Sequence, residues 1–409
     1  MHRESIALVT KQSRPIPLLP IIFAYGIVAL LTIAVAAVVT GMVISRPLAV
    51  IGSCAVASEF TARWRNEPTS CPGADLTQAD LAGAFLWNAN LSDANLQGAN
   101  LSGADLYFAN FQNSRLDHAD LSKSNLYGAT FRHARLRGTN LDDANMLGAT
   151  FHEADLSNAS LRRVNAPWLE LVNATATNVV MKGSTLDRAR VIRSHLPGAN
   201  LENTTVTNTT IIRSNFSGAT LRQATIINST IYASDLSLSR LEGIQIHGSE
   251  ARRNNFSGAA LANSVLVFTQ FTGSDFSGHQ TYGASANLDN AIMRVSNFDD
   301  SNFAHASLTE VKAFATGFRR SDLRHANFRN AALEGAAFTG ADLRNAQFSG
   351  ANLTRAKLQR AMLHGTDFTS ATLTGAILIG ADVTNVTFDG ADITDVVFRQ
   401  QATSHTSTR

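Results

Sequence analysis

A five-residue pattern of hydrophobic and polar positions runs through most of the chain, from residue 74 to residue 398. Each unit contains a small residue, then Asp or Asn, then Leu or Phe, and then two variable positions, as in Ala74-Asp75-Leu76. We call the Leu or Phe position the centre of the unit. This period matches neither the 3.6 residues of an α-helix nor the 2.0 residues of a β-strand. It predicts a backbone that turns a corner in every unit and points the centre and the small residue inward.

A second spacing, of twenty residues, predicts that four units make one coil. Large apolar residues are scarce outside the centres, but two sets of them recur at this spacing just after a centre. The first column is Trp87, Tyr107, Tyr127 and Leu147, and the second column is Val172, Ile192, Ile212 and Tyr232. Four sides predict such columns, whereas three or five sides do not. With coils about 4.8 Å apart, about sixteen coils would make a rod on the order of 75 Å long.

The small position indicates a narrow interior. In two units a larger residue stands there and the centre is small: Val164 with Ala166 and Val311 with Ala313. Asp and Asn recur so regularly before the centres that we interpret them as hydrogen-bonding groups at the corners. We do not interpret them as pairs of catalytic carboxylates.

These units resemble the A-(D/N)-L-x-x repeats of the pentapeptide-repeat family, over about four-fifths of the chain. The resemblance implies an all-β solenoid, a right-handed, four-sided parallel β-helix. We expect a first segment at 74–276 and a second at 288–398. Between them, residues 277–287 break the phase, because twelve residues instead of ten separate Phe276 from Leu288. This break is either a binding loop or a tolerated insertion.

The N-terminal part of the chain predicts a membrane anchor. Residues 18–45 form an apolar run in which no charged residue occurs, and a transmembrane helix needs about 20 apolar residues. A cleaved signal peptide ending near Ala55-Val56-Ala57 and a lipoprotein site at Cys54 are the alternatives. Against the signal peptide, the apolar run is longer than a typical signal core.

The flanking charges predict the orientation of this span. Arg3, Lys11 and Arg14 precede it, whereas Arg46 alone follows closely. By the positive-inside rule, residues 1–17 lie in the cytoplasm and the repeat domain lies outside it. The protein is therefore expected to be a single-pass membrane protein.

The region between the span and the repeats, residues 46–73, is predicted to be a linker with a capping helix. Ala57, Phe60 and Trp64 recur there at helical spacing and would cover the open N-terminal end of the solenoid. The same face could instead bind a membrane surface. The chain has only two cysteines, and outside the cytosol we expect Cys54 and Cys71 to form a disulfide. Residues 399–409 are polar, and we expect a disordered tail.

Charge and motifs exclude several classes of function. The formal net charge is +2, and from residue 72 onward 28 basic residues face 29 acidic ones, so we expect no nucleic-acid partner. Arg193, Arg213 and Arg253 form only a modest basic patch. The chain has no phosphate-binding loop, nucleophile elbow or zinc-type spacing. His305 and His325 could stack, but two histidines do not make a site. We predict no enzyme, cofactor, metal or small-molecule substrate.

The preferred hypothesis is a membrane-anchored, non-enzymatic scaffold or interaction rod whose two apolar columns bind an unknown protein partner. The alternative comes from the resemblance, since members of the family protect gyrase and give quinolone resistance by imitating DNA with an acidic rod dimerised through its C-terminus. Here the membrane span, the near-neutral body and the lack of a predicted C-terminal helix argue against that activity.

Overall fold

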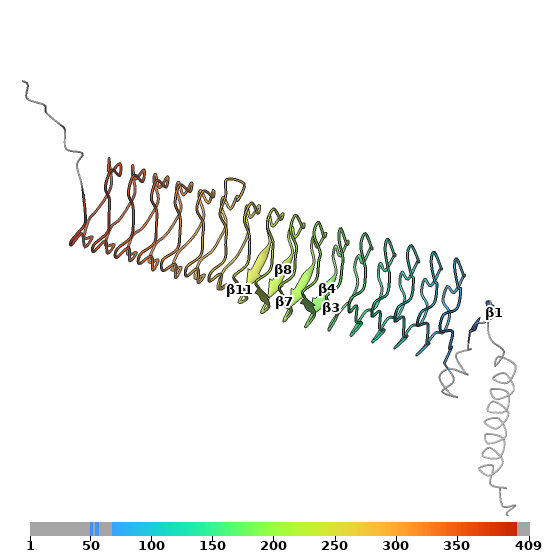
Figure 1. Ribbon diagram of the computed structural model, residues 1–409. Helices are drawn as coiled ribbons and strands as arrows, with labels where there is room; N and C mark the ends of the chain where they lie inside the picture. Colours follow the sequence, from blue (N-terminus) through green and yellow to red (C-terminus); the bar gives the residue numbers. More distant parts are fainter. Residues whose placement is uncertain (1–49, 52–53, 57–67, 399–409) are drawn as a thin grey trace, which may run out of the picture.

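The computed structural model describes residues 50–51, 54–56 and 68–398. These residues form a long rod of stacked coils (Figure 1). Parallel bridges join residues twenty apart along the first segment, for example Asp75 and Asn95, so each coil contains four five-residue units. The prediction of a parallel β-solenoid built from these units is confirmed. Its right-handedness stays a prediction.

The expected cytoplasmic segment 1–17, the transmembrane helix 18–45, the capping helix over Ala57, Phe60 and Trp64, and the tail 399–409 lie outside the described residues. No helix within the described ranges is long and apolar enough to cross a membrane.

The N-terminal end of the described rod is tied together covalently. Strand β1 (Val50–Ile51) pairs antiparallel with β2 (Cys54–Ala55). A disulfide joins Cys54 to Cys71 in the first coil, and both cysteines are buried.

Backbone hydrogen bonds connect each coil to the coils before and after it. The N–H of the centre Leu76 donates to the Asn95 carbonyl at 2.7 Å, and the Asn95 N–H donates back to the Ala74 carbonyl at 2.9 Å. Within a coil, the small residue closes a β-turn, as when the Ala79 N–H donates to the Leu76 carbonyl at 3.0 Å. The second residue after the centre has positive φ, for example 55° at Gln78, as a type II turn requires.

The Asp and Asn side chains before the centres hold the corners. The Asn100 Oδ1 accepts a hydrogen bond from the Ser102 N–H at 3.2 Å, and the Asn100 Nδ2 donates to the Asp80 Oδ1 of the preceding coil at 3.0 Å. These side chains therefore stabilise both the turn within a coil and the contact between coils, as the sequence predicted.

Nine three-residue strands interrupt this turn pattern in the middle of the rod and form two parallel sheets on neighbouring faces (Figure 1). One sheet contains β3 (Glu170–Val172), β5 (Arg190–Ile192), β7 (Thr210–Ile212), β9 (Thr230–Tyr232) and β11 (Glu250–Arg252). The other contains β4 (Thr185–Asp187), β6 (Thr205–Thr207), β8 (Thr225–Ile227) and β10 (Gln245–His247).

Two residue types explain why strands form here. Several centres are β-branched, such as Val206 and Ile211, and β-branched side chains favour extended backbone. The small positions carry hydroxyls: the Ser194 N–H donates to the Ser214 Oγ of the next coil at 3.2 Å, and the Ser214 Oγ donates to the Val191 carbonyl at 3.1 Å. Because the hydroxyl replaces the turn carbonyl as acceptor, the chain can stay extended.

The core is a continuous ladder of buried centres. Phenylalanine rings of successive coils stack nearly parallel, for example Phe111 on Phe131 with ring centroids 4.8 Å apart at 2°. Val164 with Ala166 and Val311 with Ala313 are all buried, so size is exchanged between the small position and the centre in these two units. The exchange is not general, because both positions are large and buried in Leu169 with Leu171, Val179 with Met181, and Ile244 with Ile246.

A two-residue insertion lies at the phase break. Ala260 pairs with Tyr282, twenty-two residues later, and the spacing returns to twenty with the bridge from Tyr282 to Asn302. The Thr281 hydroxyl closes the resulting loop by donating to the Ser277 carbonyl at 2.7 Å. This loop protrudes from the yellow part of the rod (Figure 1).

Gly283 follows the loop and occupies a buried centre position. A Cβ at this residue would lie 2.2 Å from the Cε1 atom of Phe303 in the next coil. The ring of Phe303 therefore fills the space that a side chain at this centre would occupy. The sequence pattern did not identify this exchange of volume between coils.

We expect Leu101→Asp to lower the free energy of unfolding of the surrounding coils by more than about 3 kcal/mol, because it places a carboxylate in a fully buried site. Gln97→Ser, on the outer surface, should change it by less than about 0.5 kcal/mol. Hydrogen exchange of the flanking coils measures both effects. Equal losses in the two variants would contradict the inward and outward assignment.

We expect Gly283→Ala to lower the free energy of unfolding by about 1–3 kcal/mol, because the added methyl group overpacks the core against Phe303. Phe303→Leu should relieve this overlap, so the double variant should be more stable than the sum of the two single changes predicts. Thermal denaturation of the four proteins gives the coupling. Additive effects would show that the ring does not fill this space.

Candidate functional site

The first apolar column is a stack of aromatic rings on the N-terminal coils. The Trp87 and Tyr107 rings lie 6.2 Å apart at 12°, and the Tyr107 and Tyr127 rings lie 4.8 Å apart at 17°. Leu147 continues the column, and all four side chains are half-buried. Because the ring faces pack on one another, mainly the ring edges are exposed to solvent.

Phe108 extends this column, and the sequence analysis did not identify it. Its ring packs edge-on against Tyr107 and Tyr127, and the residue is 48% exposed. Gly128 makes this contact possible, because a Cβ there would lie 2.5 Å from the Phe108 Cε1. The signal in the sequence is an aromatic residue followed by a glycine twenty residues later.

The second apolar column lies on the five-stranded sheet. Val172, Ile192, Ile212 and Tyr232 end β3, β5, β7 and β9, and each is in register with the next. All four are half-buried. Together they form an apolar stripe along four successive coils.

Arg193 and Arg213 each follow a stripe residue by one position, and Arg253 follows Arg252, which is in register with Tyr232; all three arginines are exposed. The Arg253 Nη1 donates to the Tyr232 hydroxyl at 3.2 Å. Arg193 and Arg213 have no carboxylate within 4.0 Å among the residues that the structure describes. The stripe therefore lies beside positive charge that is not neutralised within the rod.

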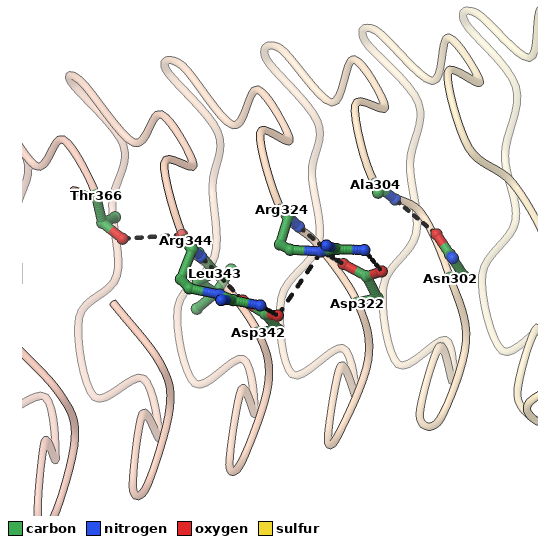
Figure 2. Close-up of polar contacts among 8 residues, drawn as sticks. All are labelled: Asn302, Ala304, Asp322, Arg324, Asp342, Leu343, Arg344 and Thr366. Atoms are coloured by element: carbon green, nitrogen blue, oxygen red, sulfur yellow. Dashed lines mark hydrogen bonds and ion pairs between the residues drawn. The ribbon is translucent and has the colours of Figure 1, made fainter. Parts of the chain in front are cut away.

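A different arrangement of charges lies near the C-terminal end, where Asp and Arg side chains alternate along the coils (Figure 2). Arg324 makes a bidentate contact with Asp322, at 2.9 and 2.8 Å, and Arg344 makes the same contact with Asp342, at 2.9 and 2.6 Å. The Arg324 Nε also lies 3.7 Å from the Asp342 Oδ2 and connects the two coils. We call Asp322, Arg324, Asp342 and Arg344 the Asp and Arg ladder. Its opposite charges neutralise one another, so the ladder stabilises the rod.

The ladder affects the protonation of Asp322. Partial burial alone would raise the pKa of its carboxyl, but the hydrogen bonds and the positive charge of Arg324 hold that pKa below its ordinary value. The hydrogen bond to Asp322 in turn raises the pKa of Arg324. The pair is therefore charged at neutral pH.

His305 and His325 stack with ring centroids 4.7 Å apart at 6°, as their spacing suggested. In the described part of the chain, no three His, Cys, Asp or Glu residues are placed to hold a metal ion. The rod interior contains an apolar void of about 20 Å³ between Leu171 and Leu236. Its lining is apolar except for Thr209, whose hydroxyl donates to the Leu186 carbonyl, and apolar voids stay dry.

Comparison with known protein families identifies the repeats. A family model of pentapeptide repeats matches the chain in eight copies. Together these matches cover residues 70–106, 104–143, 131–165, 184–223, 239–278, 351–390 and 361–400. A model of a pentapeptide repeat region matches residues 284–358. The first model alone covers more than half of the chain. No curated protein sequence is significantly similar to this chain.

Several solved structures are similar to this chain. HetL, a pentapeptide repeat protein involved in heterocyst differentiation regulation in the cyanobacterium Nostoc sp. strain PCC 7120, is 23% identical over 57% of this chain and 90% of its own, with a TM-score of 0.27. A pentapeptide repeat protein of the Arabidopsis thaliana thylakoid lumen is 36% identical over 24% of this chain and 66% of its own, with a TM-score of 0.22. QnrB1, a plasmid-mediated fluoroquinolone resistance protein, is 17% identical over 52% of this chain and 90% of its own, with a TM-score of 0.21. Scores this low add no functional argument.

We expect Arg324→Gln to lower the melting temperature at pH 7 and to have less effect as the pH falls. The native pKa of Asp322 is depressed, so its contribution to stability is present above its ordinary pKa, about 3.9, and is lost as the pH falls through the native value. Melting curves of both proteins between pH 7 and pH 3 measure this. Arg355→Gln, at an exposed arginine outside the ladder, is the control. A difference that stays constant with pH would contradict the role of the ladder.

Proposed function

The chain belongs to the pentapeptide-repeat family, and on this premise we propose that it is a membrane-anchored, non-enzymatic scaffold that binds another protein along its outer surface. The observation that carries the proposal is the apolar stripe of Val172, Ile192, Ile212 and Tyr232 on the five-stranded sheet. Apolar surface gathered on one solvent-exposed face of a protein is typical of a site that binds another protein.

The two columns contribute differently to this proposal. In the first column the rings stack face to face, so most of their area braces neighbouring coils. In the second column Ile192 and Ile212 are in register on adjacent strands and remain half-buried, beside arginines that have no carboxylate partner among the described residues. The stripe is therefore the principal contact in the proposal, and the ring column with Phe108 is a secondary one.

A binding role fits the state of the charged groups better than catalysis does. In the described repeats, many of the acidic side chains are engaged in corners or in pairs between coils, as with Asn100 and Asp80 or Arg320 and Asp300. Such groups stabilise the rod and are not free for proton transfer.

The proposed anchor is the apolar segment 18–45, with the N-terminus in the cytoplasm and the repeats outside it. Two observations support this orientation: the basic residues that precede the segment, and the disulfide between Cys54 and Cys71, since disulfides persist mainly in oxidising compartments. We do not propose gyrase protection by DNA imitation, because no observation favours it and the body carries about as many basic as acidic residues.

We expect a full-length variant with Tyr107, Tyr127, Ile192 and Ile212 replaced by Ser to lose its co-purifying protein partners by at least about ten-fold, because their apolar contact area is removed. Affinity purification from the native host with quantitative mass spectrometry measures this. The matched control replaces four outward residues by Ala: Ser102, Ser122, Glu202 and Arg222. They stand two of the four units away from Ile192 and Ile212 in the coil, on the face opposite the stripe. Unchanged recovery with the Ser variant would contradict the proposed interface.

A further inference from the structure

One side of the rod carries an excess of positive charge that the overall composition hides. Residues 190, 210, 230, 250, 270, 292 and 312 stack in consecutive coils. We call the outward side chains of 190–193, 210–213, 230–233, 250–253, 270–273, 292–295 and 312–315 the basic face. It contains seven cations, Arg190, Arg193, Arg213, Arg252, Arg253, Arg294 and Lys312, and a single acid, Glu250. From residue 72 onward, the rest of the body has 21 basic and 28 acidic residues.

Much of this positive charge is not paired within the rod. Arg190 contacts Glu170 at 2.7 Å, and Arg252 lies 3.5 Å from Glu250. The other five cations of the basic face have no carboxylate within 4.0 Å in the described ranges: Arg193, Arg213, Arg253, Arg294 and Lys312. All five are exposed. The Asp and Arg ladder near the C-terminal end shows the opposite arrangement, because its charges neutralise one another.

Apolar side chains lie among these cations. Ile192, Ile212 and Tyr232 of the stripe lie at one end of the face, and two exposed apolar residues lie toward its other end. Val295 is 64% exposed and Phe314 is 54% exposed. Phe314 also lines a surface depression together with Arg294, Lys312, Ala332 and one acid, Glu334. Val295 has a φ of 55°, which costs a β-branched residue about 1–2 kcal/mol. Solvent exposure alone does not explain a valine at such a corner.

The geometry of the face limits the kind of partner. Seven coils about 4.8 Å apart extend over about 29 Å, which matches about nine residues of extended polypeptide. Strands β5, β7 and β9 are hydrogen-bonded on both sides, so a partner cannot add to their sheet as a further strand. Recognition must use side chains: carboxylates for the unpaired cations, and apolar groups for the stripe, Val295 and Phe314.

We infer that the basic face binds an extended polypeptide segment of about nine residues in which carboxylate and apolar side chains alternate. This inference rests on the proposed function and names the chemistry of its partner. A nucleic acid would neutralise the arginines but would place phosphates against Ile192 and Ile212. A polypeptide satisfies both the charged and the apolar positions.

The test uses the full-length protein and a fluorescein-labelled decapeptide of alternating Glu and Leu, with fluorescence anisotropy as the measurement. We expect saturable binding at low salt that weakens as salt rises. Arg193→Glu with Arg213→Glu, and separately Ile192→Ser with Ile212→Ser, should each weaken it at least ten-fold. The matched control is Lys357→Glu with Arg360→Glu, which makes the same change of charge at exposed residues outside the basic face and should change affinity less than two-fold.

Three further probes complete the design: a decapeptide of alternating Glu and Ser, a decapeptide of alternating Lys and Leu, and a ten-nucleotide single-stranded DNA. Each should bind at least ten-fold more weakly than the Glu and Leu peptide. The inference is overturned if that peptide does not bind, if the control variant loses as much affinity as the arginine variant, or if the Glu and Ser peptide or the DNA binds equally well. Any of these results would overturn the inference about the basic face alone. The co-purification experiment tests the scaffold proposal separately.

Discussion

Backbone hydrogen bonds between successive coils are the interaction on which the rest of this rod depends. Each unit donates to the coil that follows it and to the coil before it, as Leu76 and Asn95 do, and in the described chain the contacts of a coil are with its neighbours. Stability is then a sum of similar local contributions. This arrangement has two requirements: a corner every five residues, and an interior narrow enough for four centres per coil. Positive φ at the corners meets the first, and the small residue that precedes most centres meets the second.

The exterior is free to vary because the interior and the backbone specify the fold. Outward positions need only tolerate the corner conformation, so rings, aliphatic stripes and charges can be placed along the coils at intervals set by the backbone. The aromatic column with Phe108, the stripe on the five-stranded sheet and the ladder of Asp322, Arg324 and Asp342 are three such arrangements on one scaffold. They differ in how many of their side chains contact one another within the rod. Side chains that contact one another stabilise the coils, whereas side chains without such contacts are available to bind a partner.

The sequence was sufficient to predict the solenoid, its twenty-residue coil and the stacked columns, because periodicity reports directly on which residues face inward. Besides Phe108, three features escaped it for identifiable reasons. The strands of the middle coils depend on hydroxyls that accept hydrogen bonds from the coil before, as Ser214 does from Ser194, which a pattern of small residues does not distinguish from alanine. Gly283 depends on a ring in another coil. The basic face spans the insertion, so Arg294 follows Arg252 by 42 residues instead of 40, and Lys312 follows Glu250 by 62 instead of 60.

The direction of the hydrogen bonds between coils also determines how the rod would respond to tension. They run along its long axis, so a pull on its two ends loads the coil boundaries in series, and the weakest boundary opens first. Each boundary that opens releases about twenty residues, or about 70 Å of extended chain. A rod of this construction resists a small force and lengthens in steps under a larger one. It would therefore limit the force transmitted between two structures fixed at its ends.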